Sequence, residues 1–133
     1  MLRVLLIVIA IILGLHGLIH FMGFVAYWPL KEVPDLPYKT TLLSGRWDLG
    51  ASGIRLFSVF WVIAAIGFVV AGIGIATQQE WGKPLLVVVT LLSLIITALD
   101  WTPAFRGTVI DVVILIVLLF GPQLTKILPQ MGS

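Results

Sequence analysis

Four long apolar stretches constrain this chain more than any other feature of its sequence. They cover residues 4–26, 54–76, 85–101 and 103–120. A helix needs about 20 mostly apolar residues to cross the hydrocarbon core of a bilayer, and the two shorter stretches fall only slightly below that length. We therefore predict an all-α polytopic membrane protein with a single transmembrane domain. Its four helices form an antiparallel bundle with both chain ends on one side.

The composition excludes an ordinary soluble protein. Of the 133 residues, 60% are hydrophobic and 11% are charged, whereas about 25% of the residues of a soluble domain are charged. The formal net charge of +2 is scattered along the chain, so we expect membrane lipids as partners and no nucleic acid. Because the chain has no cysteine, disulfides, thiolate metal sites and thiol catalysis are excluded.

Turn and capping residues predict where the helices begin and end. Proline is favoured at the first position of a helix, and Pro84 and Pro103 would take that position in the third and fourth helices. The dipeptide Gly121-Pro122 is expected to end the fourth helix. Polar side chains that can cap a helix N-terminus precede two of the helices. These are Asp48 or Ser52 before the second helix and Thr102 before the fourth.

The longest connection is a predicted interfacial loop, residues 27–53. Its prolines exclude a continuous helix, and its aromatic residues suit the headgroup level of a membrane. Cytoplasmic loops are enriched in Lys and Arg, and the loop side has the slightly larger share, so we expect the loop in the cytoplasm. The loop side has Lys31, Lys39, Arg46, Arg55 and Arg106, and the opposite side has Arg3, Lys83 and Lys126.

Polar residues inside the apolar stretches are the strongest indication of a site. An ionised side chain at mid-membrane costs about 2.5–3.5 kcal/mol, so it needs a partner or a cavity. At about 100° per residue, His16 and His20 share one face of the first helix, and Ser93 and Thr97 share one face of the third. Asp111 shares its face of the fourth helix with small residues, which favours an inward orientation.

Depth places several of these side chains in one layer. Counted from the loop side, His16, Trp61, Ser93 and Asp111 each lie about eight residues into a helix, or roughly 12 Å. We therefore predict a polar pocket in the loop-side half of the bundle, with a hydrogen bond from Asp111 to His16 or His20. The residues of this candidate ligand-binding site are His16, His20, Trp61, Ser93, Thr97 and Asp111.

The same residues admit other interpretations. His16 and His20, one turn apart on one face, could bind a metal such as zinc together with Asp111. A carboxylate beside an imidazole could also handle protons. We favour a hydrogen-bonded clamp between helices and assign no metal. Two histidines one turn apart cannot ligate both faces of one haem, so a haem held by two histidines would need a dimer or a partner protein. The sequence indicates no particular cofactor.

Charged residues near the loop-side ends are expected to form ion pairs or to surround the mouth of the pocket. Arg46 is near Asp48 in the sequence, and Asp100 is near Arg106, so we predict these two ion pairs. Arg55 lies at the same level. At a membrane interface such groups could gate a pocket or bind lipid headgroups.

Two segments of the chain resemble a group of small bacterial four-helix membrane proteins with no established activity. They are His16-Gly17-Leu18-Ile19-His20-Phe21-Met22-Gly23-Phe24 and residues 101–111. The second segment often reads W-x-D-A-K-x-G-T-x-x-N in that group, whereas this chain has Pro103, Phe105 and Asp111 at the D, K and N positions. The resemblance implies a bacterial four-helix bundle, and we expect this chain in the bacterial inner membrane.

Three functions fit the sequence. The one we favour is a module whose pocket binds a lipid-like or quinone-like molecule. The second is a structural accessory subunit or assembly factor that packs within a larger membrane complex or a homo-oligomer. The third, a membrane enzyme or proton-coupled carrier, is the least favoured, because the sequence shows no Ser-His-Asp arrangement, phosphate loop or paired-carboxylate site.

Overall fold

The computed structural model describes the backbone of residues 1–131 and the side chains of residues 1–122. This part of the chain forms four helices and two short strands. The helices are α1 (Leu2–Tyr27), α2 (Gly50–Ala76), α3 (Gly82–Leu99) and α4 (Trp101–Met131), and the strands are β1 (Thr41–Leu42) and β2 (Trp47–Asp48). Each helix is long and apolar enough to span a membrane. The predicted all-α fold with four membrane-spanning helices is confirmed.

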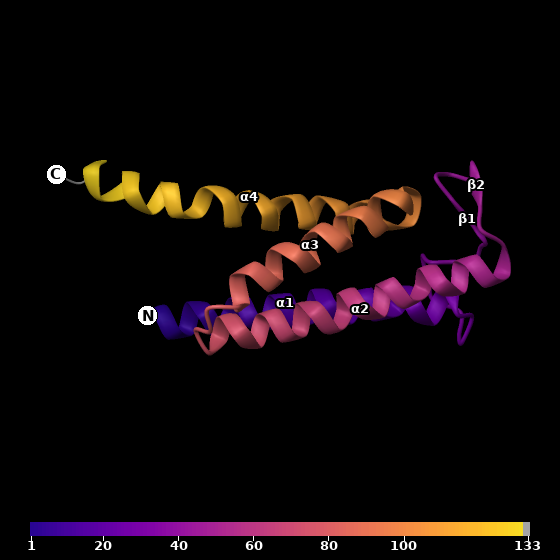
Figure 1. The fold of residues 1–133 in the computed structure, drawn as a ribbon, viewed down its shortest axis with the longest axis horizontal. Coiled ribbons are helices and arrows are strands. Elements are labelled where there is room, and N and C mark those ends of the chain that lie inside the picture. Colours follow the sequence, from indigo (N-terminus) through magenta and orange to yellow (C-terminus); the bar gives the residue numbers. More distant parts are fainter. Residues whose placement is uncertain (132–133) are drawn as a thin grey trace.

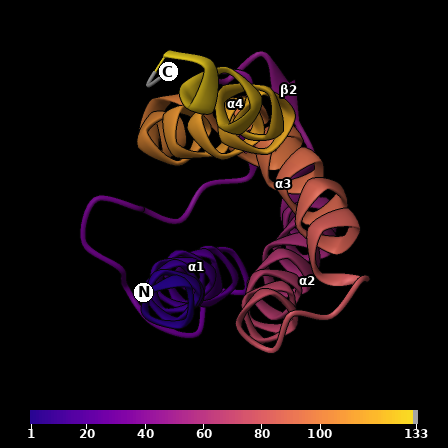
Figure 2. The same cartoon turned by 90° about the vertical axis from the view of Figure 1, so that its left-hand side faces the viewer.

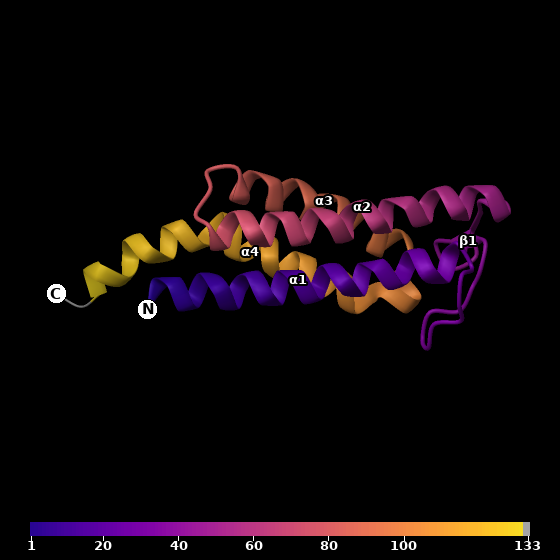
Figure 3. The same cartoon turned by 90° about the horizontal axis from the view of Figure 1, so that it is seen from below.

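The helices pack in chain order and do not close into a ring. α1 packs along α2, α2 against α3, and α3 against α4, whereas α4 and α1 are not closely packed. The N-terminus and the far end of α4 lie at one end of the molecule, and the β1–β2 hairpin lies at the other (Figures 1 and 3). Seen from the end in Figure 2, the four helices leave a gap between α1 and α4. We call this the open side.

Small residues allow α1 and α2 to approach closely. A Cβ atom added at Gly17 would lie 2.7 Å from the carbonyl oxygen of Ala65, and one added at Gly23 would lie 2.3 Å from the ring of Trp61. Neither position has room for a side chain. A small-residue face of α2 also packs inward, with Ala64, Gly67 and Ala71 against neighbouring helices.

The buried apolar side chains form two clusters along the bundle. The cluster nearer the hairpin contains Tyr27, Leu42 and Trp61 among others, so it includes a residue of the loop. The cluster nearer the chain ends is centred on Phe68 of α2 and Leu86 of α3. The buried side chains of His16, His20, Ser93 and Asp111, described below, lie between the two clusters.

The connection between α1 and α2 is shorter and more structured than the predicted loop. α2 begins at Gly50, four residues before the predicted start, and β1 and β2 form an antiparallel hairpin with Thr41 opposite Asp48. The backbone N–H of Leu43 donates to the carbonyl oxygen of Leu99, 2.9 Å away. The hairpin is therefore attached to the end of α3.

The prolines act differently from the prediction. Because α3 and α4 begin earlier than predicted, Pro84 and Pro103 are the third residues of their helices. They still lie in the first turn, where backbone N–H groups have no partner within the helix. Gly121-Pro122 does not end α4, which continues to Met131. A proline inside a helix removes one hydrogen bond, which can bend a helix without ending it.

The predicted helix caps are largely wrong. Ser52 and Thr102 lie inside α2 and α4, and the residue that precedes α2 is Leu49, whose side chain makes no capping hydrogen bond. Asp48 does accept a hydrogen bond from the backbone N–H of Gly50, at 2.9 Å. Lys126, which the predicted charge distribution includes, lies outside the residues whose side chains are described.

Candidate functional site

His16 of α1 and Asp111 of α4 are joined directly across the open side. Nε2 of His16 lies 3.1 Å from Oδ1 of Asp111, and the two side chains are 5% and 0% exposed. The predicted hydrogen bond between these residues is confirmed. It brings two ionisable side chains together inside the apolar bundle, where each would otherwise be costly.

Ser93 of α3 connects Asp111 to the second histidine. Its Oγ lies 2.5 Å from Oδ2 of Asp111 and 2.5 Å from Nε2 of His20. Nδ1 of His20 in turn lies 2.8 Å from the carbonyl oxygen of His16. These four residues, His16, His20, Ser93 and Asp111, form a continuous hydrogen-bonded set that we call the polar cluster.

Two threonines extend the polar cluster between α3 and α4. Oγ1 of Thr97 donates to the carbonyl oxygen of Ser93 at 2.8 Å and lies 3.4 Å from Oδ2 of Asp111. Thr108 donates to Oγ1 of Thr97 at 2.9 Å. All these side chains are buried. The contact between α3 and α4 therefore carries an interhelical hydrogen bond, as small polar residues often do in membranes.

Aromatic side chains of α2 contact the imidazole rings of His16 and His20. The His20 ring lies 5.4 Å from the Trp61 ring and 5.2 Å from the Phe68 ring, measured between centroids. The His16 ring meets Phe68 edge-on at 4.7 Å. Trp61 and Phe68 belong to different apolar clusters, so the polar cluster is held between the two.

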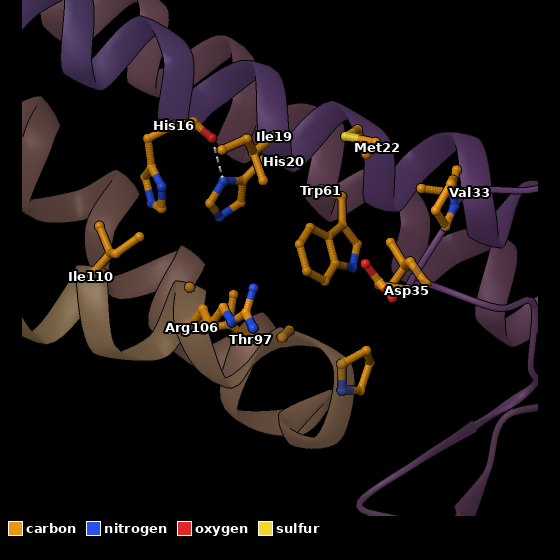
Figure 4. A pocket seen from close by; sticks show the side chains of 15 residues that line it. His16, Ile19, His20, Met22, Val33, Asp35, Trp61, Thr97, Arg106 and Ile110 are labelled. Carbon is orange, nitrogen blue, oxygen red and sulfur yellow. Dashed lines mark hydrogen bonds between the residues drawn. The ribbon is translucent and has the colours of Figure 1, made fainter.

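A cavity of about 340 Å³ lies against the polar cluster on the open side (Figure 4). α1 and α4 provide most of its lining, with loop residues Val33–Leu36 at one end. The lining is mostly apolar, and the imidazoles of His16 and His20 form part of its wall. Thr97 and Trp61 also line the cavity. The structure thus brings four of the six predicted ligand-binding residues to the cavity wall. The other two, Asp111 and Ser93, lie behind it and contact the wall residues His16 and His20.

The indole N–H of Trp61 has no hydrogen-bond acceptor in the described part of the chain. Trp61 is 4% exposed, and its Nε1 atom is buried. Figure 4 shows the ring facing the space between α1 and α4. A buried donor without an acceptor costs about 1–3 kcal/mol. An oxygen atom placed in the cavity could accept this hydrogen bond.

A second polar group lies at the loop end and surrounds Asp100. The hydroxyl of Tyr27 donates to Oδ2 of Asp100, and Nζ of Lys39 lies 2.5 Å from Oδ1. Burial raises the pKa of Asp100, and its contacts with Lys39 and Tyr27 oppose this by lowering the pKa. Tyr27 ends α1, Lys39 belongs to the loop, and Asp100 separates α3 from α4, so this group joins three parts of the chain.

Neither predicted ion pair forms. Asp100 turns inward to Tyr27 and Lys39, so it is not available to Arg106, whose guanidinium lies over the ring of Phe105. Among the side chains of residues 1–122, ion pairs involve only His16 with Asp111 and Lys39 with Asp100.

The remaining charged residues near the mouth have local contacts. The hydrogen bond from the backbone N–H of Gly50 lowers the pKa of Asp48, which does not pair with Arg46. Arg55 lies with its guanidinium carbon 5.7 Å from the centre of the Trp28 ring. Asp35 and Arg106 are the charged residues that line the cavity, and both are exposed.

His16, His20 and Asp111 are also close enough to be considered as metal ligands. One ligand atom from each lies within 4.8 Å of the others. Binding a metal would require these atoms to give up their hydrogen bonds with one another and with Ser93. Because those hydrogen bonds already pair the three side chains with one another and with Ser93, the geometry favours the interhelical clamp.

Sequence reasoning misses one part of this site. Lys39 is predicted only as a loop charge, and its contact with Asp100 depends on the path of the loop, which no periodic pattern indicates. Tyr27 follows His16 and His20 on the same face of α1, so helical periodicity does indicate its inward direction.

Comparison with protein-family models, with curated proteins and with solved structures finds no match to this chain.

Proposed function

We propose that this chain is a small integral membrane protein that binds a lipid-like or quinone-like molecule in the cavity on the open side. The observation that carries the proposal is the buried N–H of Trp61, which has no acceptor within residues 1–122 and faces an apolar cavity. Ligand pockets are typically about 300–1,000 Å³ in volume, mostly apolar, with a few placed polar groups. This cavity has that character.

The position of the cavity favours an amphiphilic ligand. Ile19 and Met22 of α1 and Ile110 of α4 line the cavity and are also exposed on the outer surface of the bundle. In a membrane this surface would contact acyl chains, so a ligand could enter from the bilayer between α1 and α4. Its tail would remain among apolar side chains while its polar head reaches His16 and Trp61.

Native mass spectrometry of the protein released from mild detergent tests this proposal. We expect a small molecule bound at one copy per chain, identified after extraction by mass and fragmentation. Ile19→Trp should remove it, because Ile19 lines the cavity and a larger side chain would fill its mouth. Leu18→Trp is the matched control, since Leu18 is the neighbouring residue, is similarly exposed and does not line the cavity.

Two outcomes would overturn the proposal. One is a wild-type protein that carries no small molecule and takes up none when incubated with a decyl-substituted benzoquinone or with the corresponding benzoquinol. The other is equal occupancy in the Ile19→Trp and Leu18→Trp variants, which would place the bound molecule on the lipid-facing surface.

The surface of α4 favours a second candidate, a structural subunit of a larger membrane assembly. Only 11% of the most apolar window of its span, Trp101–Pro122, is buried within this chain. A partner protein or a second copy could cover the remainder. Isolation in a lipid-preserving polymer would distinguish the two, because a subunit should co-purify with a stoichiometric protein partner or as an oligomer.

We also propose a bacterial inner membrane as the location, with the β1–β2 hairpin on the cytoplasmic side. The resemblance of residues 16–24 and 101–111 to bacterial proteins supports the first, and the larger share of Lys and Arg at the hairpin end supports the second. Because the chain has no cysteine, Ser44→Cys would be a unique label site. An impermeant maleimide should label it in inverted vesicles and not in intact cells.

A further inference from the structure

The hydrogen atoms of the polar cluster can be counted from its contacts. A carbonyl oxygen only accepts, so Nδ1 of His20 must carry the hydrogen that it donates to the carbonyl oxygen of His16. In a neutral His20 the other nitrogen, Nε2, is then an acceptor. It lies 2.5 Å from Oγ of Ser93, and Oδ2 of Asp111 lies 2.5 Å from the same oxygen. The single hydroxyl hydrogen of Ser93 cannot serve both.

One additional proton resolves this conflict. If it is on Oδ2 of Asp111, that atom donates to Ser93 and Ser93 donates to His20. If it is on Nε2 of His20, His20 donates to Ser93 and Ser93 donates to Asp111. Both arrangements satisfy every contact around Ser93 and leave the cluster with no net charge, which an apolar environment favours.

The location of this proton determines which nitrogen of His16 faces a ligand. Because the proton is needed between Asp111 and His20, it is not available at Oδ1 of Asp111, which therefore accepts. Nε2 of His16 must then donate across the 3.1 Å contact. In a neutral imidazole the second nitrogen, Nδ1, is left as an acceptor. His16 lines the cavity, and its Nδ1 has no hydrogen bond within residues 1–122.

Beside the polar cluster the cavity wall therefore presents an acceptor and a donor, Nδ1 of His16 and the N–H of Trp61. We propose that it binds amphiphiles with a hydroxyl head, such as phenols and quinols, in preference to heads with only acceptor oxygens, such as quinones and ethers. A hydroxyl can donate to His16, and an oxygen of the same head can accept from Trp61. This inference rests on the proposed function and specifies its ligand class.

The test compares two probes, 4-decylphenol and its methyl ether. They differ only in that a methyl group replaces the hydroxyl hydrogen. Their dissociation constants would be measured by equilibrium dialysis against the protein in nanodiscs, with protein-free nanodiscs subtracted. The Nδ1 acceptor of His16 receives a hydrogen bond from the phenol and none from the ether. We expect the phenol to bind at least about tenfold more tightly.

The outcomes separate this inference from the proposed function. If both probes bind with equal affinity and Ile19→Trp blocks both, the cavity is a binding site and the hydroxyl preference is refuted. If neither probe binds saturably, or if Ile19→Trp and Leu18→Trp bind the phenol equally, the binding function itself is refuted.

Variants of Asp111 test the positioning role assigned to it. Asp111→Leu removes the acceptor that holds His16 with Nε2 as donor, so the preference for the phenol should be lost. Asp111→Asn should restore it, because the amide oxygen accepts from His16 and the amide N–H₂ donates to Ser93. Equal loss in both variants, at equal thermal stability, would contradict the proton count. If the leucine variant does not fold, the two-probe measurement on the wild-type protein still decides the inference.

Discussion

The two sides of α1 are held in different ways. Toward α2 the contact is steric and apolar, with Gly17 and Gly23 fitted against backbone and ring atoms. Toward α3 and α4 the described contacts include the polar links of His16 with Asp111, His20 with Ser93, and Tyr27 with Asp100. The cavity lies on this second side.

The difference explains where a site can exist in so small a bundle. Close packing of small residues excludes any ligand from the contact between α1 and α2. Polar links hold two helices at a distance without filling the space between them, so they leave room for a ligand. They also place donors and acceptors on the wall of that space.

The largest expected effect on the free energy of unfolding is at the contact between α1 and α2. Gly23→Ala should lower the free energy of unfolding by about 3 kcal/mol, because the new methyl group would overlap the Trp61 ring and overpacking costs about 1–3 kcal/mol. Thermal unfolding in detergent measures this. Gly14→Ala on the same helix is the control, since nothing lies within 4 Å of its Cβ position and its stability should not fall. Equal stabilities of the two variants would show that the α1–α2 contact is not tight.

The ion pair at the loop end should have the next largest effect. Lys39→Met leaves the carboxylate of Asp100 buried without its cation, which costs 3–5 kcal/mol in a fully buried pair. Because Lys39 is 27% exposed, we expect a loss of about 2 kcal/mol at neutral pH.

The pH dependence of this loss follows from the direction of the pKa shift. Burial raises the pKa of Asp100, so the folded protein binds its proton more tightly than the unfolded chain, and stability falls as the pH rises through that window. Removing Lys39 takes away a contact that lowers this pKa, which extends the window to higher pH. The gap between variant and wild type should therefore shrink toward acidic pH. A constant gap from pH 4 to pH 8 would contradict this.

Within the polar cluster we expect a smaller effect. Ser93→Ala leaves Nε2 of His20 and Oδ2 of Asp111 without their shared partner, at a cost of about 1.5 kcal/mol. Ser58→Ala is the matched control, because Ser58 is also fully buried but donates only to the carbonyl oxygen of Arg55 in its own helix. If both variants lose the same stability in thermal unfolding, the interhelical links do not hold the open side.

The smallest effect on stability is expected at the cavity mouth. Ile19→Trp replaces a side chain that is already exposed, so the free energy of unfolding should change by less than about 0.5 kcal/mol. Its effect should appear only in ligand binding. A large loss of stability without any bound ligand would mean that Ile19 packs within the core.

The sequence predicts the two polar groups, one around Asp111 and one around Asp100, unequally well. Helical periodicity and depth bring His16 and Asp111 to one layer, because both follow from the constant rise and twist of a helix. The pairing of Asp100 was wrong, because nearness in sequence to Arg106 does not fix the direction of a side chain at a turn. That direction depends on the loop, which carries Lys39 to Asp100 by an irregular path.

The open side itself could not be predicted. Each helix has one inward polar or small-residue face, and this pattern is equally consistent with a closed ring of four helices. Whether α4 returns to α1 depends on the angle at which α3 crosses α2, which is set by the shapes of packed side chains such as Val89 against Gly67. The N–H of Trp61, which has no acceptor within residues 1–122, faces this opening.

Fluorescence of Trp61 tests most directly whether the open side holds a ligand. A variant that retains Trp61 alone, with the exposed Trp28, Trp47, Trp81 and Trp101 replaced by Phe, would be titrated in nanodiscs with 2-bromo-4-decylphenol. The bromine quenches a nearby indole, so we expect saturable quenching that reaches most of the signal. A variant that retains only Trp81, at the opposite end of the bundle, should show weak and linear quenching. Linear quenching of equal strength in both variants would contradict a ligand site beside Trp61.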